Sequence, residues 1–419
     1  MKSLTNALFK KWILLTIISF FILSACQKQI DQLSNPQEIS SIANKGNNEN
    51  RIYVSDISQL YAAVNNPANT GRIVVLAPGT YILNASYPIA GRLELLENME
   101  LQGQPGHPEL VIIDASLLPG TSFVPPLNFP SGRTGAIRMG RGVNSIEWIT
   151  VKGNSSDQAL SVIDTDLIWP DGPSNIRVAH SIITGGRIGI DIRNVGAASV
   201  DRVLEAEIVD NEVVENLVEF GQGIEVQNAN GATGAIIRAT LNGKYVHGNK
   251  IGMRTFNNNA NNNTNSRSIT IQSNADRFEE NGIGIYLAAS LNQGLTTTGN
   301  GNLLHFEAHG TSIQNNQGTL PPDVTEPSRG GIYAVGGFST NGGVASDNRL
   351  EINLWGCLIS GNHGPDIKAY GALSNSATIA GTNNVVNIHL YGVSANATVN
   401  ATQSFPAEPA ATNTVNIFR

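Results

Sequence analysis

Hydrophobic positions in this chain recur in one short phrase. The phrase reads Gly-Ile, then one variable residue, then Ile, Val or Leu, and full copies occupy residues 189–192, 223–226 and 284–287. Looser copies begin at residues 252, 331 and 366, so successive copies start 29 to 47 residues apart. Repeats of this length indicate an array of stacked modules. The segments between them are short strand patterns broken by Gly and Asn, without a helical stripe, and the sequence therefore predicts a β-solenoid.

The phrase also predicts one surface of the solenoid. Side chains alternate along a strand, so the residues that flank the variable position point inward, while the variable residue points outward and stacks on its equivalents one coil away. These variable residues are Asp191, Glu225, Arg254, Tyr286, Tyr333 and Lys368. Two positions further along each strand lie Arg193, Gln227, Phe256, Ala288, Val335 and Tyr370. We expect both columns on an exposed face that runs from acidic, through Arg, to aromatic and then to Lys.

Asn residues precede several of the phrases, at positions 249, 281, 315, 316 and 362. Asn tolerates left-handed backbone, and stacked Asn side chains hydrogen-bond from one rung to the next. We interpret these residues as structural ladders and not as ligands. The His residues at 180, 247, 305, 309, 363 and 389 lack the spacing of metal ligands and are assigned no role.

Residues 1–26 have the pattern of an export signal. A basic start precedes an apolar run, Trp12 to Leu23, that is too short for a comfortable membrane span. The run ends in Leu-Ser-Ala-Cys, which resembles a bacterial lipobox and implies cleavage before Cys26 and lipidation of that residue. A lipid would hold the protein on a membrane surface. Gln27 then favours the outer membrane, with the leaflet left open; an ordinary secretory signal or an uncut anchor is the alternative.

Composition limits what the rest of the chain can form and bind. Residues 27–50 are polar and predict a flexible tether, so residues 51–419 are expected to form a single domain. The net charge is −7, and loss of the leader with its three Lys takes it to −10, which argues against a nucleic-acid partner. With Cys26 assigned to lipid, no intramolecular disulfide is expected, and Cys357 is predicted to be a small core residue. Trp148 and Trp355 are also expected in the core.

The start of the domain carries a family resemblance. Residues 56–64 have helical spacing with Asp56 or Ser55 as N-cap, and residues 72–81 read as a buried strand, a Pro-Gly turn and a second strand. This order resembles the opening of right-handed parallel β-helix proteins of the pectate-lyase-like superfamily. The resemblance implies an all-β, single-domain, right-handed parallel β-helix, with a short helix that covers the otherwise open first coil.

The outward columns suit a polysaccharide, because sugar rings stack on aromatic faces and Arg and Lys neutralise uronate carboxylates. Tyr286, Tyr333, Lys368 and Tyr370 are therefore candidate substrate-binding residues. Pectate lyases of this superfamily hold Ca²⁺ with acidic residues and use an Arg as base. By this resemblance alone, Asp191 and Glu225 would bind Ca²⁺, and Arg254 or Arg193 would be the base.

Other interpretations stay open. The same residues also fit an ordinary surface ion-pair network, and the catalytic phrases of polygalacturonases, pectate lyases and pectin methylesterases are not evident. The leading hypothesis is a membrane-anchored, cell-surface or periplasmic lipoprotein that interacts with polysaccharide. Cleavage of an acidic polysaccharide by lyase or hydrolase chemistry is left open. The alternative is a non-catalytic structural, adhesin or scaffold protein. An enzyme should hold its polar groups in a groove walled by residues 120–133 and 318–329, whereas a spacer should present an open face.

Overall fold

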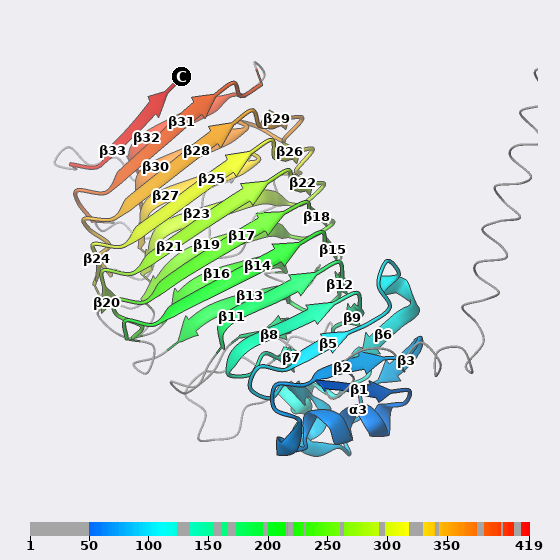
Figure 1. The fold of residues 1–419 in the computed structure, drawn as a ribbon. Coiled ribbons are helices and arrows are strands. Elements are labelled where there is room, and N and C mark those ends of the chain that lie inside the picture. Colours follow the sequence, from blue (N-terminus) through cyan, green and yellow to red (C-terminus); the bar gives the residue numbers. More distant parts are fainter. Residues whose placement is uncertain are drawn as a thin grey trace, which may run out of the picture. The chain divides into compact units, whose positions relative to one another are not determined.

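A computed structural model describes the solenoid. The described residues are 50–123, 135–154, 161–165, 173–195, 200–214, 216, 221–229, 231–259, 264–292, 298–317, 330–339, 343–374, 381–394, 397–405 and 412–419. The chain divides into two units, Met1–Arg51 and Ile52–Arg419. The predicted leader, Cys26 and nearly all of the tether lie outside the described residues. The second unit is a right-handed parallel β-solenoid, which confirms the predicted fold (Figure 1).

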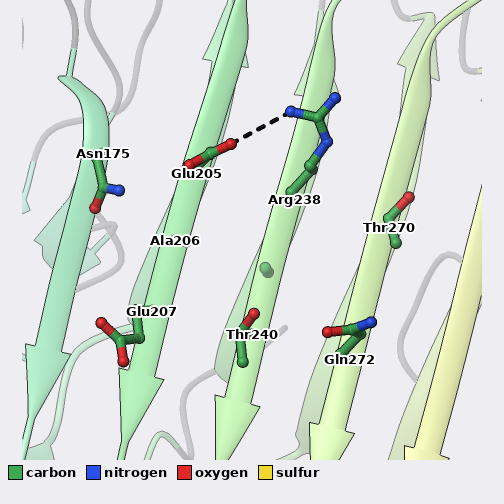
Figure 2. Close-up of a pocket in the computed structure, with 9 residues that line it drawn as sticks. Asn175, Glu205, Ala206, Glu207, Arg238, Thr240, Thr270 and Gln272 are labelled. Atoms are coloured by element: carbon green, nitrogen blue, oxygen red, sulfur yellow. Dashed lines mark hydrogen bonds and ion pairs between the residues drawn. The ribbon is translucent and has the colours of Figure 1, made fainter.

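Three parallel sheets run the length of the solenoid, and one of them, sheet A, has twelve strands in the described part of the chain. Side chains of neighbouring strands lie beside one another on its outer face, as Glu205 and Arg238 do (Figure 2). Its strands are β1 (Arg51–Val54), β2 (Ile73–Leu76), β5 (Glu100–Gln102), β8 (Gly142–Glu147), β11 (Pro173–Ala179), β14 (Val203–Val209), β17 (Ile236–Asn242), β21 (Ser268–Asn274), β25 (Leu303–His309), β28 (Arg349–Trp355), β31 (Val385–Tyr391) and β33 (Thr414–Phe418).

Sheet B follows sheet A in each coil, and its strands are mostly three residues long. They are β3 (Gly79–Ile82), β6 (Val111–Asp114), β9 (Thr150–Lys152), β12 (Ile182–Thr184), β15 (Glu212–Val214), β18 (Tyr245–His247), β22 (Arg277–Glu279), β26 (Ser312–Gln314) and β29 (Leu358–Ser360). The turn between sheets A and B passes through one residue in left-handed backbone, such as His180, Asp210 or Gly243.

Sheet C contains the Gly-Ile phrases. Its strands are β4 (Leu93–Glu94), β7 (Gly135–Arg138), β10 (Ser161–Asp164), β13 (Ile188–Val195), β16 (Gln222–Ala229), β19 (Ile251–Asn259), β23 (Ile283–Asn292), β27 (Ile332–Ser339), β30 (Ile367–Ser374) and β32 (Val399–Phe405). In the described part of the chain, a fourth sheet consists of two short strands, β20 (Thr264–Asn265) and β24 (Gly299–Asn300), and joins two loops.

The predicted capping helix is present as α3 (Ile57–Val64) at the N-terminal end (Figure 1). Asp56 is its N-cap, because its side chain accepts a hydrogen bond of 2.8 Å from the backbone N–H of Gln59. The helix buries Leu60 and Tyr61 on the first coil, and the Tyr61 hydroxyl donates to the carbonyl of Gly91. The helix therefore covers core that the first coil would otherwise expose to water.

The interior is filled by side chains that stack in register. Ile190 lies beside Ile224 in the next coil, and the same column continues through Met253, Ile285, Ile332 and Ile367. All six are fully buried members of one hydrophobic cluster. The inward positions of the Gly-Ile phrase are thus confirmed as the core-facing positions of sheet C.

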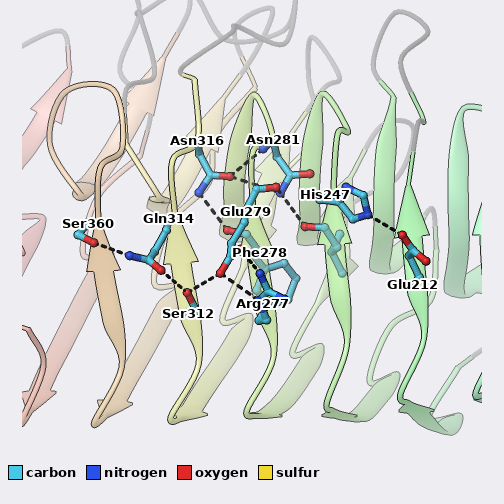
Figure 3. A network of polar contacts seen from close by, with 11 residues as sticks. Glu212, His247, Arg277, Phe278, Glu279, Asn281, Ser312, Gln314, Asn316 and Ser360 are labelled. Atoms are coloured by element: carbon cyan, nitrogen blue, oxygen red, sulfur yellow. Dashed lines mark hydrogen bonds and ion pairs between the residues drawn. The ribbon is translucent and has the colours of Figure 1, made fainter. Parts of the chain in front are cut away.

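Asn side chains form a continuous ladder at the turn between sheets B and C. Asn216, Asn249, Asn281, Asn316 and Asn362 each accept hydrogen bonds from, or donate to, the Asn of the adjoining coil. Figure 3 shows Asn281 and Asn316 of this ladder. Within this ladder, the prediction for residues 249, 281, 316 and 362 is confirmed. Asn315 is not part of it and instead takes left-handed backbone, with φ of 55°. A second ladder, which we did not predict, joins Asn302, Asn348, Asn384 and Asn413 before sheet A.

A buried ion pair lies at the turn between sheets A and B. Lys244 Nζ lies 2.8 Å from Asp276 Oδ1, and both side chains are inaccessible to solvent. Ser273 donates to the other oxygen of Asp276 at 2.6 Å. Burial lowers the pKa of Lys244 to about 8, while the charge and hydrogen bond of Asp276 oppose that shift.

Removing one member of the Asn ladder should destabilise the solenoid. Asn281 accepts from the backbone N–H of Asn249 and donates to the carbonyl of Val246, so Asn281→Ala leaves both groups buried and unpaired. We expect a loss of about 3 kcal/mol in the free energy of unfolding, measured by urea denaturation. Asn353→Ala, on the outer face of sheet A, is the control and should change that value by less than about 0.5 kcal/mol. Equal values for the two variants would contradict a structural ladder.

Lys244 should make stability depend on pH. The unfolded lysine has a pKa of 10.5 and the folded one about 8. Between these values the unfolded chain binds one more proton, so the free energy of unfolding attributable to Lys244 rises with pH. The stability difference between the unmodified protein and Lys244→Met should shift by about 2 kcal/mol in favour of the unmodified protein from pH 8 to 10. Lys250→Met controls for the loss of one charge at the surface. A difference independent of pH would refute the assignment.

Candidate functional site

The outward column predicted from the Gly-Ile phrases exists on sheet C. Neighbouring strands pair Asp191 with Glu225, Glu225 with Arg254, and Arg254 with Tyr286. The column continues through Tyr333 and Lys368. The second column is in register as well, and it contains Arg193, Gln227, Phe256, Ala288, Val335 and Tyr370. We name the outer face of sheet C that contains these two columns the stripe.

The stripe is not exposed, and the prediction of an exposed face was wrong. Its side chains point away from the solenoid core, yet Asp191 and Glu225 are 0% exposed and Arg254 is 5% exposed. Only Lys368 among the six variable residues is half-buried. A second hydrophobic cluster, separate from the core, is buried in the C-terminal coils of the same face and includes Ile251, Phe256, Ile283, Tyr286, Ala288, Leu291, Tyr333, Val335, Phe338, Tyr370 and Leu373. Apolar side chains on this face are removed from water together with the polar ones.

The stripe extends further toward the N-terminus than we predicted. Asp191 pairs with Asp164, Asp164 with Arg138, and Arg138 with Glu94. These three residues were missed because strands β4, β7 and β10 lack the Gly-Ile phrase. The signal was nevertheless present, since Val162-Ile163-Asp164 repeats the alternation that places Asp191 after Ile190.

The N-terminal half of the stripe is a charged network. Arg138 lies 3.3 Å from Glu94 Oε1 and 3.8 Å from Asp164 Oδ2. Asp164 Oδ2 also accepts a hydrogen bond of 2.9 Å from the backbone N–H of Gly135. Burial is the main cause that lowers the pKa of the neighbouring Arg92, which indicates a poorly solvated environment.

The predicted metal pair lies in the centre of this network. Ser161 donates to Asp191 Oδ2 at 3.2 Å, and Arg193 Nε lies 3.6 Å from Asp191 Oδ1. Glu225 accepts a hydrogen bond from the side-chain amide of Gln227. The structure therefore brings Asp191, Glu225 and Arg193 together.

The fit of these residues to calcium is limited. Ca²⁺ takes six to eight oxygen ligands, and Asp191 and Glu225 supply at most four. Within the described ranges, no group of three or more His, Cys, Asp or Glu side chains is arranged to hold a metal ion. Calcium at this pair therefore stays a prediction.

The C-terminal half of the stripe is aromatic. The Arg254 guanidinium lies 4.5 Å from the ring centre of Phe256 and 5.3 Å from that of Tyr286, in cation–π geometry. Tyr286 and Tyr333 meet edge to face at 5.3 Å, and the next tyrosine, Tyr370, lies 5.8 Å further along. Lys368 Nζ lies 5.5 Å from the centre of the Tyr370 ring. The four predicted substrate-binding residues thus form one contiguous group.

The two tryptophans expected in the core lie outside it. Trp355 is 41% exposed and stacks on Tyr391 at 3.7 Å between ring centres. Trp148, with φ of 59°, lies in a turn and stacks on His180 at 4.1 Å. In both pairs, the face of one ring stacks on the face of a ring in the next coil, along the solenoid axis. Cys357 is a buried free thiol, as predicted, and burial raises its pKa.

The outer faces of the other sheets are more open. Sheet A has a pocket of about 370 Å³ over strands β11, β14, β17 and β21 (Figure 2). Sheet B carries a surface network in which His247 contacts Glu212 at 2.9 Å and Arg277 contacts Glu279 at 2.6 Å (Figure 3). The hydrogen bond from Arg277 is the main cause that lowers the pKa of Glu279. Of the predicted groove walls, only Gly120–Phe123 is described, as a 3₁₀ turn; residues 124–133 and 318–329 lie outside the described residues.

Comparison with known proteins does not assign this chain to a family. No protein-family model matches the chain, and no curated protein matches it. A solved structure titled as the complex of XylC with xylose is 10% identical, with a TM-score of 0.34, and the match covers 77% of this chain and 56% of that one. The catalytic domain of Agl-KA is 12% identical, with a TM-score of 0.39, and the match covers 86% of this chain and 65% of that one. The chain thus spans less than two thirds of each protein, and similarity this low says nothing about its chemistry.

Proposed function

We propose that this protein acts on an acidic polysaccharide through the stripe. The observation that supports the proposal is a buried network of charged side chains outside the solenoid core. Asp164, Asp191 and Glu225 occupy successive positions of one column, and Arg138 and Arg254 stand at its two ends. All five are at most 5% exposed.

The fold does not require this network. The core of the solenoid lies on the other side of sheet C and is closed by Ile, Leu and Val side chains. Buried ion networks lose much of their Coulombic gain to desolvation, and apolar residues of similar volume are often as stable or more stable. Groups of charged residues held in a poorly solvated site are typical of functional sites.

The residue types favour an anionic sugar chain. Arg193 and Arg254 present guanidinium groups, which pair with carboxylates in a planar, bidentate geometry. Tyr286, Tyr333 and Tyr370 supply aromatic surface in the adjoining coils, and Lys368 adds a cation at the far end. The order of the stripe would place uronate groups near the cations and sugar rings near the tyrosines.

Two reaction classes fit the network. In a lyase, Arg254 or Arg193 would remove the proton next to the substrate carboxylate, and the glycosidic oxygen would leave to give an unsaturated sugar. In a hydrolase, two of the three stacked carboxyl groups would serve as acid and base. Either reaction requires the outer face of sheet C to become accessible to substrate, because its reactive groups are almost fully buried.

A non-catalytic scaffold is the second candidate. The burial of the stripe favours it. In this case the stripe would be an internal packing element and would bind no sugar. The two candidates differ in whether the unmodified protein binds or cleaves a polysaccharide.

We further propose that Cys26 is lipidated and that residues 27–50 tether the solenoid to the bacterial membrane, most simply the outer membrane. The short apolar run that ends in Leu-Ser-Ala-Cys supports this proposal. Among the described residues, no helix is long and apolar enough to cross a bilayer.

A polysaccharide assay tests the first proposal. The full chain, in mild detergent, is incubated with pectin, alginate and glycosaminoglycans. Ultraviolet absorbance of unsaturated ends, release of reducing ends and retardation in polysaccharide-loaded gels are then recorded. We expect activity or binding toward an acidic polymer, reduced at least tenfold in Arg254→Ala and in the near-isosteric Asp191→Asn. A tenfold loss corresponds to about 1.4 kcal/mol.

The controls separate the candidates. Asn353→Ala changes an outward residue of sheet A and should leave the assay unchanged, while circular dichroism confirms that each variant folds. Addition of a chelator, followed by Ca²⁺, tests the predicted metal: loss and recovery support it, and indifference removes it. Absence of both cleavage and retardation across the panel would favour the scaffold.

Replacement of the lipobox cysteine tests the anchor. Cys26→Ser removes the thiol that would carry the lipid, so the protein should move from the membrane fraction to the soluble fraction after cell lysis. Ser24→Ala, two residues earlier, is the matched control and should stay with the membrane. Mass spectrometry of the N-terminal peptide reports lipidation directly. An unchanged distribution of Cys26→Ser would contradict the proposal.

A further inference from the structure

A pocket lies on sheet A, on a different sheet from the stripe. The pocket of about 370 Å³ opens on the outer face of strands β11, β14, β17 and β21 (Figure 2). The stripe belongs to sheet C, whose outer face lies on another side of the solenoid. Unlike the stripe, the pocket is lined by exposed side chains, including Glu205, Glu207 and Gln272.

The shape of the pocket follows from the register of the strands. Thr240 lies between Glu207 in the preceding coil and Gln272 in the following one. A short side chain between two long ones leaves a hollow in an otherwise flat face. Ala206 and Ala239 face the core, so they form the floor of this hollow through their backbone atoms.

The charged groups at the pocket neutralise one another. Arg238 lies 3.3 Å from Glu205, and Arg177 lies 2.7 Å from Glu207. Arg177 also contacts Glu147 at 2.7 Å, so this chain of three has one more acid than base. An anionic ligand would therefore find no unpaired cation in the pocket, and the small excess of negative charge would repel it.

The uncharged groups remain available to a ligand. In the described part of the chain, the side chains of Asn175, Thr240, Thr270 and Gln272 make no hydrogen bond to protein groups, although all four line the pocket. Amide and hydroxyl groups both donate and accept hydrogen bonds. Their natural complement is a ligand that carries many hydroxyl groups and no charge.

We propose that this pocket binds a neutral saccharide. Its volume lies at the small end of the range of roughly 300–1,000 Å³ for ligand pockets, so about one or two sugar rings fit. The pocket contains no aromatic side chain on which a ring can stack, and the dissociation constant is expected to be about 1 mM. A protein with the acidic-polysaccharide site proposed for sheet C would then contact two chemically different sugars on two faces.

Calorimetric titration with neutral oligosaccharides tests this site. The full chain in mild detergent is titrated with cellotetraose, xylotetraose and maltotetraose, and with tetragalacturonate as the charged comparison. We expect at least one neutral sugar to bind. Thr240→Tyr fills the hollow on an exposed position and should weaken that binding at least tenfold, and Gln272→Ala should weaken it about fivefold. Asn353→Ala, on the same column two strands beyond Gln272, should bind as the unmodified protein does.

The outcomes also separate the pocket from the stripe. Binding of the neutral sugar that survives Arg254→Ala and is lost in Thr240→Tyr assigns the site to sheet A. Binding that is lost in Arg254→Ala and kept in Thr240→Tyr overturns the proposal, whether or not the stripe acts on acidic polymers. Absence of binding by every neutral sugar overturns it as well. Tighter binding of tetragalacturonate, weakened by Thr240→Tyr, would show that the ligand class is wrong.

Discussion

In the described part of the solenoid, strands of neighbouring coils pair in parallel, with register shifts at Pro173/Asn175 and at Phe256/Asn258. Most strand side chains therefore lie beside the equivalent side chains of the coils before and after them. Many buried polar groups therefore find a hydrogen-bond partner along the solenoid axis. Asn281 does so with Asn249 and Asn316, and Lys244 does so with Asp276. Apolar columns and Asn ladders are two solutions to the same constraint, and both repeat for as long as the register is kept.

The same constraint explains what the sequence revealed. A phrase with a period of two assigns inward and outward positions without knowledge of the rest of the chain. Ile190 and Ile224 lie in the core cluster, and the residues after them, Asp191 and Glu225, pair outside it, which confirms that assignment. Parity would also have placed Trp355 correctly, because Leu354 already faces inward and adjacent strand residues face opposite sides. Asp164 was missed for a related reason, since we followed the Gly-Ile phrase instead of the alternation itself.

Exposure was not predictable in this way. Whether an outward side chain meets water depends on what lies against the sheet, and strand alternation does not record this. The hydrophobic residues that accompany Tyr286 and Tyr333 on the outer face of sheet C were visible in the sequence. An outward column that contains Phe256, Ala288 and Val335 is too apolar for a solvated face, and this composition was the available signal that the stripe is buried.

The outer faces of sheets C and A differ in burial and therefore suit different chemistry. On sheet C, cations and carboxylates are held with little solvent around them, where electrostatic interactions are strong and proton transfer is tunable. On sheet A, the charges around Thr240 are paired at the surface, and the remaining hydrogen-bonding groups suit weak, reversible contacts. A solenoid can carry both because each face depends on the register and not on the other face. The apolar core, the capped N-terminal coil and the ladders stabilise the solenoid, and the outer faces are then free to differ.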